Sequence, residues 1–587
     1  MIGLAHAVFE VTDRVRARER LVLVNYASTK IGSTLDVLHT AQELTDVVVP
    51  VFADHVYVNL LDPVFGGEEP VAGPVSEETP LRRAASSNVP EGPAEPVVAV
   101  GDVDPFTSTA GSLFSRALAS QEPLLLTGEE VCAKLTAVDP HRAGLVHEYG
   151  VHSWLLVPMF ARGAALGAAV FIRFRGTHGF ETDDVLLAQE LVARAAVCID
   201  NARRYTQERT TALALQRSLL PQQMPVLGAV EVAARYLPAS GHTVLGGAWF
   251  DVNPLSGARV ALAAGNAAGH GLHAAVTMGR LRTAERTLAD LDLSPEELLT
   301  RLDDLVNRFP EEGRAEPTGG AAGSTCVYAV FDPITRRCAI ARAGHPPPAR
   351  VSKDGSVAFL DPPGGPPLGR GGAPFESGEV ALADGDLLVL YAGALADTED
   401  QRTGTGPAWL REVLSDSQLT TPAGLDDVCD TVIRHILSSR PTEDAALLVA
   451  RVHELAPDRH ITWDLPADPE IVAEARTRAA RTLAEWGLEE LEFTTELIVS
   501  ELVTNAIRYG TPPLQLRLIR DRHLICEVTD NSSTSPHIRR ALETDEGGRG
   551  LYMVAQLAQL WGTRYHARGK TVWTEQLFPD GSAARAF

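Results

Sequence analysis

The chain has 587 residues, of which 45% are hydrophobic and 22% are charged, and its formal net charge is −24. This composition excludes a disordered chain, and the length predicts about three to four domains. The acidic balance argues against a general nucleic-acid surface, which needs basic patches.

The six cysteines are scattered without a C-x-x-C pair, so we expect neither a disulfide framework nor a zinc site. No apolar run reaches the roughly 18 residues that a membrane span needs. Residues 1–20 have a helical pattern without the basic start of a signal peptide. We therefore expect a cytoplasmic protein with no membrane segment.

The first domain is predicted over residues 21–184. The β-branched and apolar runs 47–61 and 153–174 are expected to be strands, with a hairpin at "ARGAALG", and residues 62–105 mostly loop. The pattern from "LLVPMFARGAALG" to "CIDNARRY" resembles a GAF domain, a module that senses small molecules or proteins. Its ligand is unknown. A GAF fold that binds nothing and only mediates dimers is equally compatible with the sequence, because no ligand-binding residues stand out.

A linking helix is predicted over residues 185–228. Val185, Val192 and Ile199 recur every seven residues, as do Ala188, Ala195 and Ala202. This spacing indicates a coiled coil and hence a homodimer. The alternative is a helix that packs on the sheet of its own GAF-like domain.

The second domain is predicted over residues 229–453. Alternating strands separated by turn signals, and two helices after Gly271, indicate a layered α+β sandwich. Together with "AGHPPP", "PPLG" and "MGRLRTA", this block resembles the SpoIIE-type metal-dependent serine/threonine phosphatases of the PPM family. The resemblance implies an α/β/β/α sandwich and a reaction that uses two divalent cations.

Four positions depart from the acidic pattern of that family. Aspartates are expected in G-G-D-W-Y-D, G-D-x-x-G-H-G, Y-T-D-G and D-D-x-A-L-L, and this chain has Ala248, Asn266, Gly393 and Glu443 there. Divalent cations need anionic oxygen ligands, and three of these residues carry no charge. We therefore expect no Mn²⁺ or Mg²⁺ in this domain, and we interpret His270 and His345 as structural residues of turns.

The third domain is predicted over residues 458–578. A strongly periodic helix places Glu501 and Asn505 one turn apart, a hairpin ends at Asp530, and glycines precede a second helix. This order resembles the histidine-kinase-like ATPase fold, in its branch of anti-sigma-factor serine kinases (the RsbW and SpoIIAB type). Tyr509 is a departure, since a histidine is common at that position.

The resemblance implies an ATP site with Mg²⁺. Asn505 would hold the Mg²⁺, Glu501 would be the general base, and Asp530 would bind the adenine amino group with support from Thr571. The phosphate-binding lid would be formed by Gly547, Gly548, Arg549, Gly550 and Leu551. The alternatives are a solvated helix residue at Glu501 and a cap or turn partner at Asn505.

These features together predict a partner-switching regulator of signal transduction. Its kinase domain would phosphorylate a STAS-type anti-sigma-factor antagonist and hold a sigma factor, beside a phosphatase-like domain that has lost its metals. One alternative is an active SpoIIE-type phosphatase. The other is an ATP-gated scaffold without turnover.

Overall fold

A computed structural model describes residues 18, 20–70, 79–92, 98–107, 112–136, 139–176, 178–221, 223–239, 246–308, 321–396, 407–415, 424–438, 443–534, 550–566 and 568–578. The chain forms two compact units, Met1–Thr211 and Ala212–Phe587, which we describe separately. None of the helices in the described ranges combines the length and the apolar run needed to cross a bilayer.

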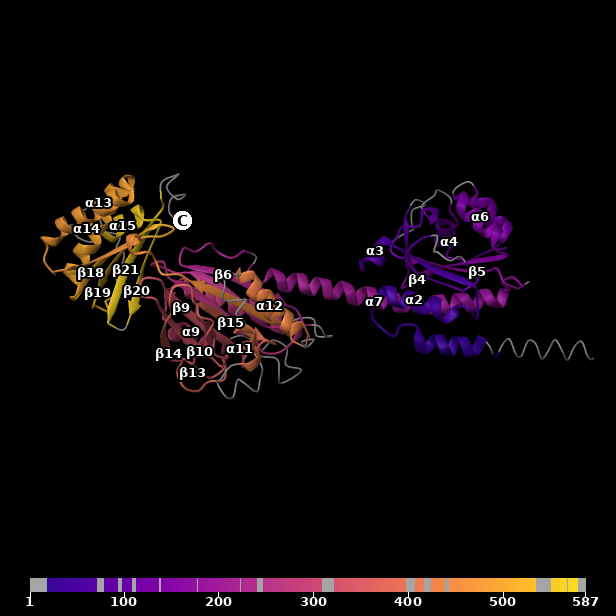
Figure 1. Ribbon diagram of the computed structural model, residues 1–587, viewed down its shortest axis with the longest axis horizontal. Coiled ribbons are helices and arrows are strands. Elements are labelled where there is room, and N and C mark those ends of the chain that lie inside the picture. The colour runs from indigo at the N-terminus through magenta and orange to yellow at the C-terminus, as the bar shows by residue number, and fades with distance from the viewer. Residues whose placement is uncertain are drawn as a thin grey trace, which may run out of the picture. The chain divides into compact units, whose positions relative to one another are not determined.

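The first unit is built on a five-stranded antiparallel sheet with strand order β2-β1-β5-β4-β3 (Figure 1). Residues 20–30 are helical and precede the elements that follow. The strands are β1 (His55–Leu61), β2 (Leu81–Asn88), β3 (Leu124–Thr127), β4 (Ser153–Ala161) and β5 (Ala164–Arg173). The helices are α2 (Val37–Val48), α3 (Asp62–Phe65), the 3-10 turn η1 (Pro105–Thr107), α4 (Leu113–Ser120), α5 (Gly128–Leu135), α6 (Pro140–Glu148) and α7 (Thr182–Ser218).

The predicted β4–β5 hairpin is confirmed, with its turn at Arg162 and Gly163, which both have positive φ. One other expectation for this unit is wrong. Residues 47 and 48 end helix α2 rather than begin a strand, because α2 buries one face that includes Leu44 and Val48. The described residues of the stretch 62–105 are mostly loop, as expected, and they also contain strand β2, whose sequence, LRRAASSN, holds no β-branched or aromatic residue.

The heptad seam of α7 packs inside the first unit. Ala188, Val192, Ala195, Ile199 and Ala202 are at most 1% exposed and belong to the core of the sheet. The structure therefore has the alternative arrangement, a helix packed on its own domain. These side chains are not available to a coiled coil, and the seam no longer argues for a homodimer.

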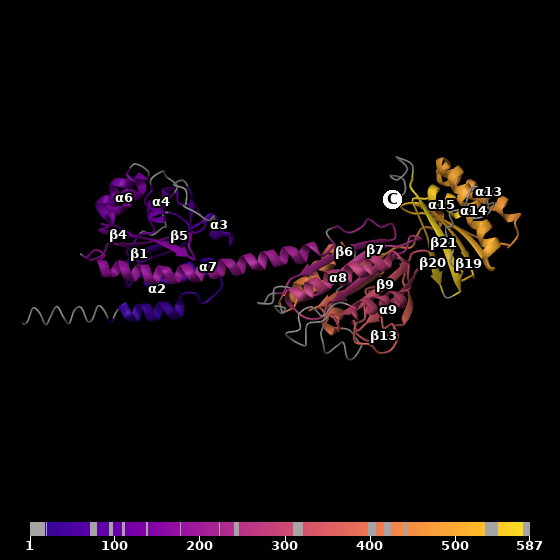
Figure 2. The ribbon, with the colours of Figure 1, turned by 180° about the vertical axis from the view of Figure 1, so that it is seen from behind.

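The middle domain in the second unit is a four-layer sandwich. Its first sheet has the order β13-β10-β9-β8-β7, with β14 beside β10, and its second sheet has the order β12-β11-β15-β16-β6. An apolar core lies between the sheets, and separate cores lie under the helices on either side. Helices α11 and α12 lie in front of their sheet in Figure 1, and α8 lies in front in Figure 2, which is turned by 180°. These helices therefore cover opposite outer faces of the sandwich.

The strands of the middle domain are β6 (Val230–Leu237), β7 (Ala248–Pro254), β8 (Val260–Asn266), β9 (Thr325–Asp332), β10 (Arg337–Ala343), β11 (Ala349–Val351), β12 (Val357–Phe359), β13 (Gly364–Gly365), β14 (Ser377–Ala381), β15 (Leu387–Gly393) and β16 (Ala445–Val452). Its helices are α8 (Gly271–Ala289), α9 (Pro295–Val306), α11 (Ala408–Leu414) and α12 (Leu425–Ser438). The predicted α/β/β/α sandwich is confirmed.

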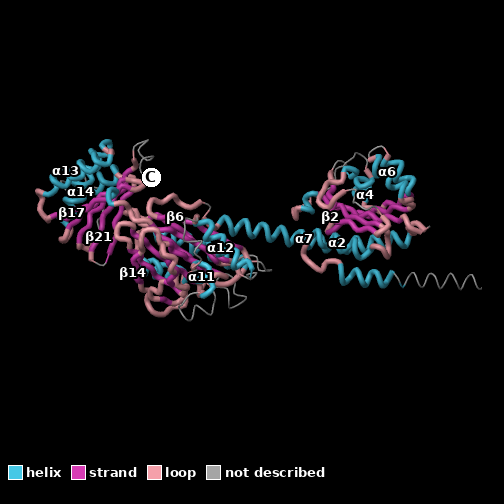
Figure 3. The backbone as a smooth tube through the Cα atoms, viewed as in Figure 1, coloured by secondary structure: helices cyan, strands magenta, loops and turns pink. Residues whose placement is uncertain are grey.

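The C-terminal domain has helices on one face of an antiparallel sheet with order β17-β18-β19-β21-β20 (Figure 3). Its elements are η3 (Pro457–Arg459), β17 (His460–Leu465), α13 (Ile471–Trp486), η4 (Glu489–Leu491), α14 (Glu492–Tyr509), β18 (Leu514–Arg520), β19 (Leu524–Asp530), α15 (Gly550–Leu557), β20 (Leu560–His566) and β21 (Gly569–Gln576). The predicted long helix, hairpin and last strand are confirmed, and β20 is an additional strand.

The middle and C-terminal domains share a junction within the second unit. Ile519 and Ile525 of the C-terminal sheet form a small apolar cluster with Ala258 and Leu455. Beside it, Arg564 donates to the Ser256 hydroxyl over 2.8 Å and to the Glu527 carboxylate over 3.1 Å. In this pair the Glu527 side chain is 3% exposed and the Arg564 side chain is 16% exposed.

Candidate functional site

Helix α14 carries the first two predicted site residues of the C-terminal domain. Glu501 and Asn505 are half-buried and lie one turn apart. Gly550, at the start of α15, packs directly on them: a Cβ atom there would overlap Oε2 of Glu501 and lie 3.7 Å from Nδ2 of Asn505. A larger residue would displace the Glu501 carboxylate, so glycine allows this close contact, which brings the backbone of α15 next to a carboxylate and an amide.

Asp530 lies at the end of β19 and is 2% exposed. Its Oδ1 accepts hydrogen bonds from the backbone N–H of Ser532 over 2.7 Å and from Nζ of Lys570 over 3.0 Å. Oδ2 is also 3.0 Å from Nζ. A carboxylate has about four acceptor positions, so Oδ2 retains capacity for a ligand amino group.

The pairing of β19 with β21 sets which residue of β21 meets Asp530. Asp530 is opposite Lys570, and Thr529 is opposite Thr571. The Thr571 hydroxyl therefore hydrogen-bonds to that of Thr529 at 2.8 Å, and Lys570 is the side chain against the carboxylate. Sequence analysis missed Lys570, because a lone lysine in a strand gives no signal of its cross-strand partner.

The predicted lid is only partly within the described residues. Gly547, Gly548 and Arg549 lie outside them. Leu551 is half-buried and packs against the core of the domain. Glu501, Asn505 and Gly550 are thus brought together by α14 and α15, with Asp530 beside Gly510 at the end of α14, where a Cβ would lie 2.7 Å from its carboxyl carbon.

The four altered positions of the middle domain lie at neighbouring ends of its two sheets. Ala248 on β7 pairs directly with Asn266 on β8. Gly393 ends β15 with a φ of 66°, and a Cβ there would lie 3.1 Å from that of Ala248 and overlap the Asp444 carbonyl oxygen. Glu443 is exposed, and the acid that the structure brings to Ala248 and Gly393 is its neighbour, Asp444.

Asp444 is 2% exposed and surrounded by donors of the protein itself. Its Oδ2 accepts hydrogen bonds from the Tyr236 hydroxyl, from the Ala248 N–H over 3.1 Å and from Nε2 of Gln216 over 3.3 Å. Burial raises the pKa of the Asp444 carboxyl to about 6, despite these hydrogen bonds. Gln216 comes from the last turn of α7, a contact between distant residues that sequence patterns do not reveal.

The other polar residues near these positions are also engaged. Asp251 accepts from Nε of Arg282 over 3.0 Å. His345 is buried, its Nδ1 lies 3.1 Å from the Pro346 carbonyl oxygen, and burial lowers its pKa to about 4. His270 is exposed at the start of α8. Within the described ranges, no three His, Cys, Asp or Glu side chains gather as a metal site would require, so the described side chains alone do not supply the ligands of a two-metal centre.

Three family models match the chain, and they match in sequence order. The GAF domain model matches residues 36–199, the Stage II sporulation protein E (SpoIIE) model matches 256–453, and the histidine kinase-like ATPase domain model matches 465–575.

Solved structures with related folds include the RsbU and RsbW domains of a Mycobacterium tuberculosis protein, at 24% identity over 60% of this chain and 96% of that chain, with a TM-score of 0.35. The SiaA-PP2C domain of Pseudomonas aeruginosa matches at 19% identity over 43% of this chain and 98% of that chain, with a TM-score of 0.34. The PP2C phosphatase domain of SpoIIE from Bacillus subtilis, with a fragment of its regulatory domain, matches at 15% identity over 38% of this chain and 64% of that chain, with a TM-score of 0.31. The chain thus carries, in this order, domains that match the GAF, SpoIIE and histidine kinase-like ATPase families.

Proposed function

We propose that this protein is a partner-switching regulator whose C-terminal domain is an ATP-dependent serine kinase. The observation that carries the proposal is the cluster of Glu501, Asn505 and Gly550, in a domain that matches the histidine kinase-like ATPase model. The partner would be a small STAS-type antagonist that presents a serine, and the same domain would hold a sigma factor.

In this proposal the nucleotide is held at both ends. Asp530 accepts a hydrogen bond from the adenine amino group through Oδ2. The backbone of α15 at Gly550 would lie at the phosphates, and the amide oxygen of Asn505 would hold Mg²⁺, which would supply positive charge to the phosphates.

Glu501 is the proposed general base. Its carboxylate takes the proton of the partner's serine hydroxyl while the serine oxygen bonds to the γ-phosphorus, and ADP departs as the bond to the β-phosphate oxygen breaks. The contact with Gly550 supports this role, because it holds Oε2 of Glu501 at the helix start where the phosphates would lie.

The middle domain is proposed to be a pseudophosphatase that acts as a scaffold. Ala248 and Gly393 offer no side-chain ligand. Among the described residues, the carboxylate beside them is that of Asp444, which already accepts hydrogen bonds from Tyr236 and Gln216. Two divalent cations would meet too little negative charge to offset their desolvation.

The test uses the full-length protein with Mg-ATP and candidate STAS proteins. Calorimetry should show ATP binding that Asn505→Ala abolishes. Glu501→Gln should keep ATP affinity and slow phosphotransfer by a factor on the order of 10²–10⁴, the usual effect of a general base. Glu496→Gln, five residues earlier on the same helix, is the matched control and should change neither.

Three outcomes contradict the proposal in different ways. ATP binding without transfer to any STAS protein indicates the ATP-gated scaffold. Unchanged transfer in Glu501→Gln removes that residue from catalysis. Metal-dependent dephosphorylation of the phosphorylated partner by the same protein indicates the active phosphatase.

A further inference from the structure

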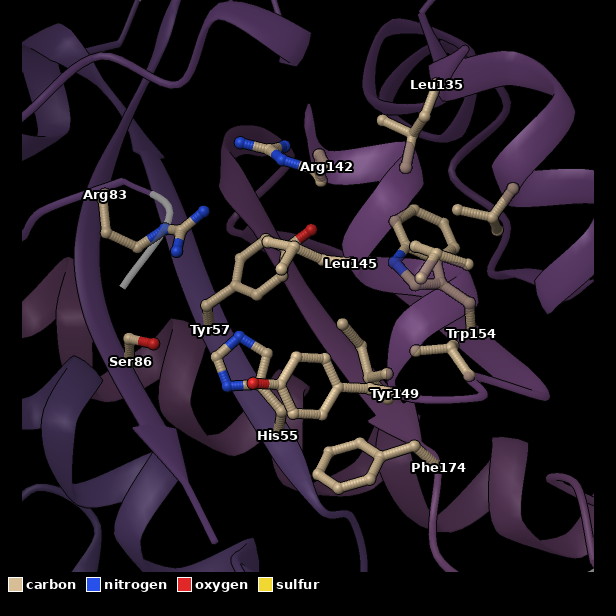
Figure 4. Close-up of a pocket in the computed structure, with 14 residues that line it drawn as sticks. His55, Tyr57, Arg83, Ser86, Leu135, Arg142, Leu145, Tyr149, Trp154 and Phe174 are labelled. Atoms are coloured by element: carbon tan, nitrogen blue, oxygen red, sulfur yellow. The ribbon is translucent and has the colours of Figure 1, made fainter. Parts of the chain in front are cut away.

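The first unit contains a cavity of about 90 Å³ between one face of its sheet and helices α5 and α6 (Figure 4). Strands β1 and β2 contribute His55, Tyr57, Arg83 and Ser86, and α6 contributes Arg142. A pocket for a drug-sized ligand measures about 300 Å³ or more, so this cavity suits a much smaller molecule than a nucleotide.

One end of the cavity is cationic. Among the described residues, the lining contains Arg83 and Arg142 and no carboxylate, and Figure 4 shows both guanidiniums at the same end, above the ring of Tyr57. Both arginines are held by Asp104, which is fully buried outside the lining: Nη2 of Arg83 lies 2.9 Å from Oδ2 and Nη2 of Arg142 lies 3.0 Å from Oδ1. Burial would raise the pKa of Asp104, but the two guanidiniums outweigh it and lower that pKa, so this acid stays charged.

Asp104 alone does not neutralise the two guanidinium charges at this end of the cavity. Two cations share that one carboxylate, and the second acid, Asp139, lies 3.4 Å from Nε of Arg142 at the more exposed start of α6. Arg83 uses its Nε for Asn59 and its Nη2 for Asp104. Among its hydrogen bonds to described residues none uses Nη1, so this group remains for a ligand. A buried guanidinium whose positive charge is only partly neutralised favours the binding of an anion.

The opposite end offers a hydrogen-bond acceptor. Nδ1 of His55 lies 3.0 Å from the Ser87 carbonyl oxygen, and a carbonyl only accepts, so Nδ1 carries the proton. Burial and the nearby Arg83 lower the pKa of His55 to about 4, so the ring is neutral and its Nε2 is an acceptor. A ligand hydroxyl is the matching donor.

Between these ends the lining is aromatic and aliphatic. Figure 4 shows Tyr149 and Phe174 beside His55, and Trp154 and Leu135 on the far side of the cavity. Aromatic rings in the lining favour a planar aromatic ligand over a flexible polar one.

We propose that the first unit binds a small aromatic carboxylate of the hydroxybenzoate class, with its carboxylate at Arg83 and Arg142 and its hydroxyl at His55. The ring lies between Tyr57, Tyr149 and Trp154. This assignment rests on the first unit alone and goes beyond the proposed function, so its failure leaves the kinase proposal unaffected.

The test uses the full-length protein and calorimetry with 4-hydroxybenzoate, benzoate and 4-hydroxybenzamide. 4-Hydroxybenzoate should bind, benzoate should bind more weakly, and the neutral amide should bind at least about tenfold more weakly because it forms no charge-assisted hydrogen bond. Equal affinity for the acid and the amide overturns the role of the arginines. Absence of binding by the wild-type protein at millimolar 4-hydroxybenzoate overturns the ligand class.

A variant that fills the cavity tests the location. Leu145→Trp adds volume inside the lining and keeps every charge, and it should abolish binding. Leu186→Trp, at an exposed position of α7 in the same unit, is the control and should bind as the wild type does. Unchanged affinity in Leu145→Trp places the ligand elsewhere and overturns the proposal. The ligand series on the wild-type protein decides the chemistry even if this variant does not fold.

Discussion

Lys570 and Asp530 form a buried ion pair in which Nζ lies 3.0 Å from both carboxylate oxygens. The side chains are 7% and 2% exposed. The ammonium group thus pairs with a buried carboxylate at the point where an adenine amino group is expected, and it connects the stability of the C-terminal domain to its proposed nucleotide site.

Lys570→Met should destabilise the C-terminal domain by about 3–5 kcal/mol, because it leaves a buried carboxylate without its cation. The matched control is Lys353→Met, since Lys353 also lies 3.0 Å from a carboxylate, that of Asp384, but with side chains 65% and 49% exposed. Exposed pairs contribute about 0–1 kcal/mol. Calorimetric melting of the full-length variants measures both shifts, and equal shifts would contradict the role given to burial.

Asp444 gives the middle domain a pH dependence. Its pKa is raised from 3.8 to about 6 by burial, so folding favours the protonated acid. This contribution to stability is present below about pH 4 and is lost as the pH rises through about 6. Asp444→Asn should therefore gain stability relative to the wild type across that window, by up to about 3 kcal/mol. A difference between the two melting curves that does not vary with pH would contradict the shift.

Gly393 limits any attempt to rebuild the metal site. Gly393→Ala should cost more stability than Gly371→Ala, although the two glycines have φ angles of 66° and 64°. At Gly371 a Cβ meets no atom within 4 Å, so only the backbone strain of about 1–2 kcal/mol applies. At Gly393 the Cβ also overlaps the Asp444 carbonyl oxygen, which is fixed by the N–H of Ala394 over 2.8 Å.

Reinstating the four aspartates tests whether the backbone at Gly393 prevents a rebuilt metal site. Because of this overlap, the combined change of Ala248, Asn266, Gly393 and Glu443 to aspartate should lower the melting temperature and give no stabilisation by Mn²⁺. The same set without the Gly393 substitution should fold better. A rise in melting temperature with Mn²⁺ in the fourfold variant would show that the loops still have the geometry of a metal site.

Arg564→Met should loosen the junction between the middle and C-terminal domains. It removes the hydrogen bond to Ser256 and leaves Glu527 with Arg517 at 3.5 Å. Hydrogen exchange in β20 and around Ser256 should increase. The control is Arg337→Met, which removes a surface pair with Glu379. Unchanged exchange in Arg564→Met would show that the apolar cluster alone holds the junction.

Much of the fold follows from local sequence patterns. The period of α14 and the alternation in β18 predict those elements, because each buries one face in the core. The heptad seam of α7 is present as a pattern, yet the same spacing serves a helix on a sheet as well as a coiled coil. Which of the two forms depends on tertiary partners that the spacing does not encode.

The candidate sites follow from the sequence only where a family pattern places them. Glu501, Asn505 and Asp530 stand in such a pattern. The charge partner of Asp530 and the donor from Gln216 to Asp444 depend on contacts across 40 and 228 positions of the chain. The cavity of the first unit was missed for the same reason, since Arg83 lies in a strand of small and polar residues and meets Arg142 only through Asp104.

The junction around Ile525 has a practical consequence for dividing this protein into fragments. A C-terminal fragment expressed alone would present Ile519 and Ile525 to water, together with Arg564, which now contacts Ser256. Apolar side chains uncovered in this way favour self-association. A recombinant C-terminal fragment should therefore be more soluble when it retains the middle domain, and a loss of nucleotide binding in a shorter fragment would first indicate aggregation.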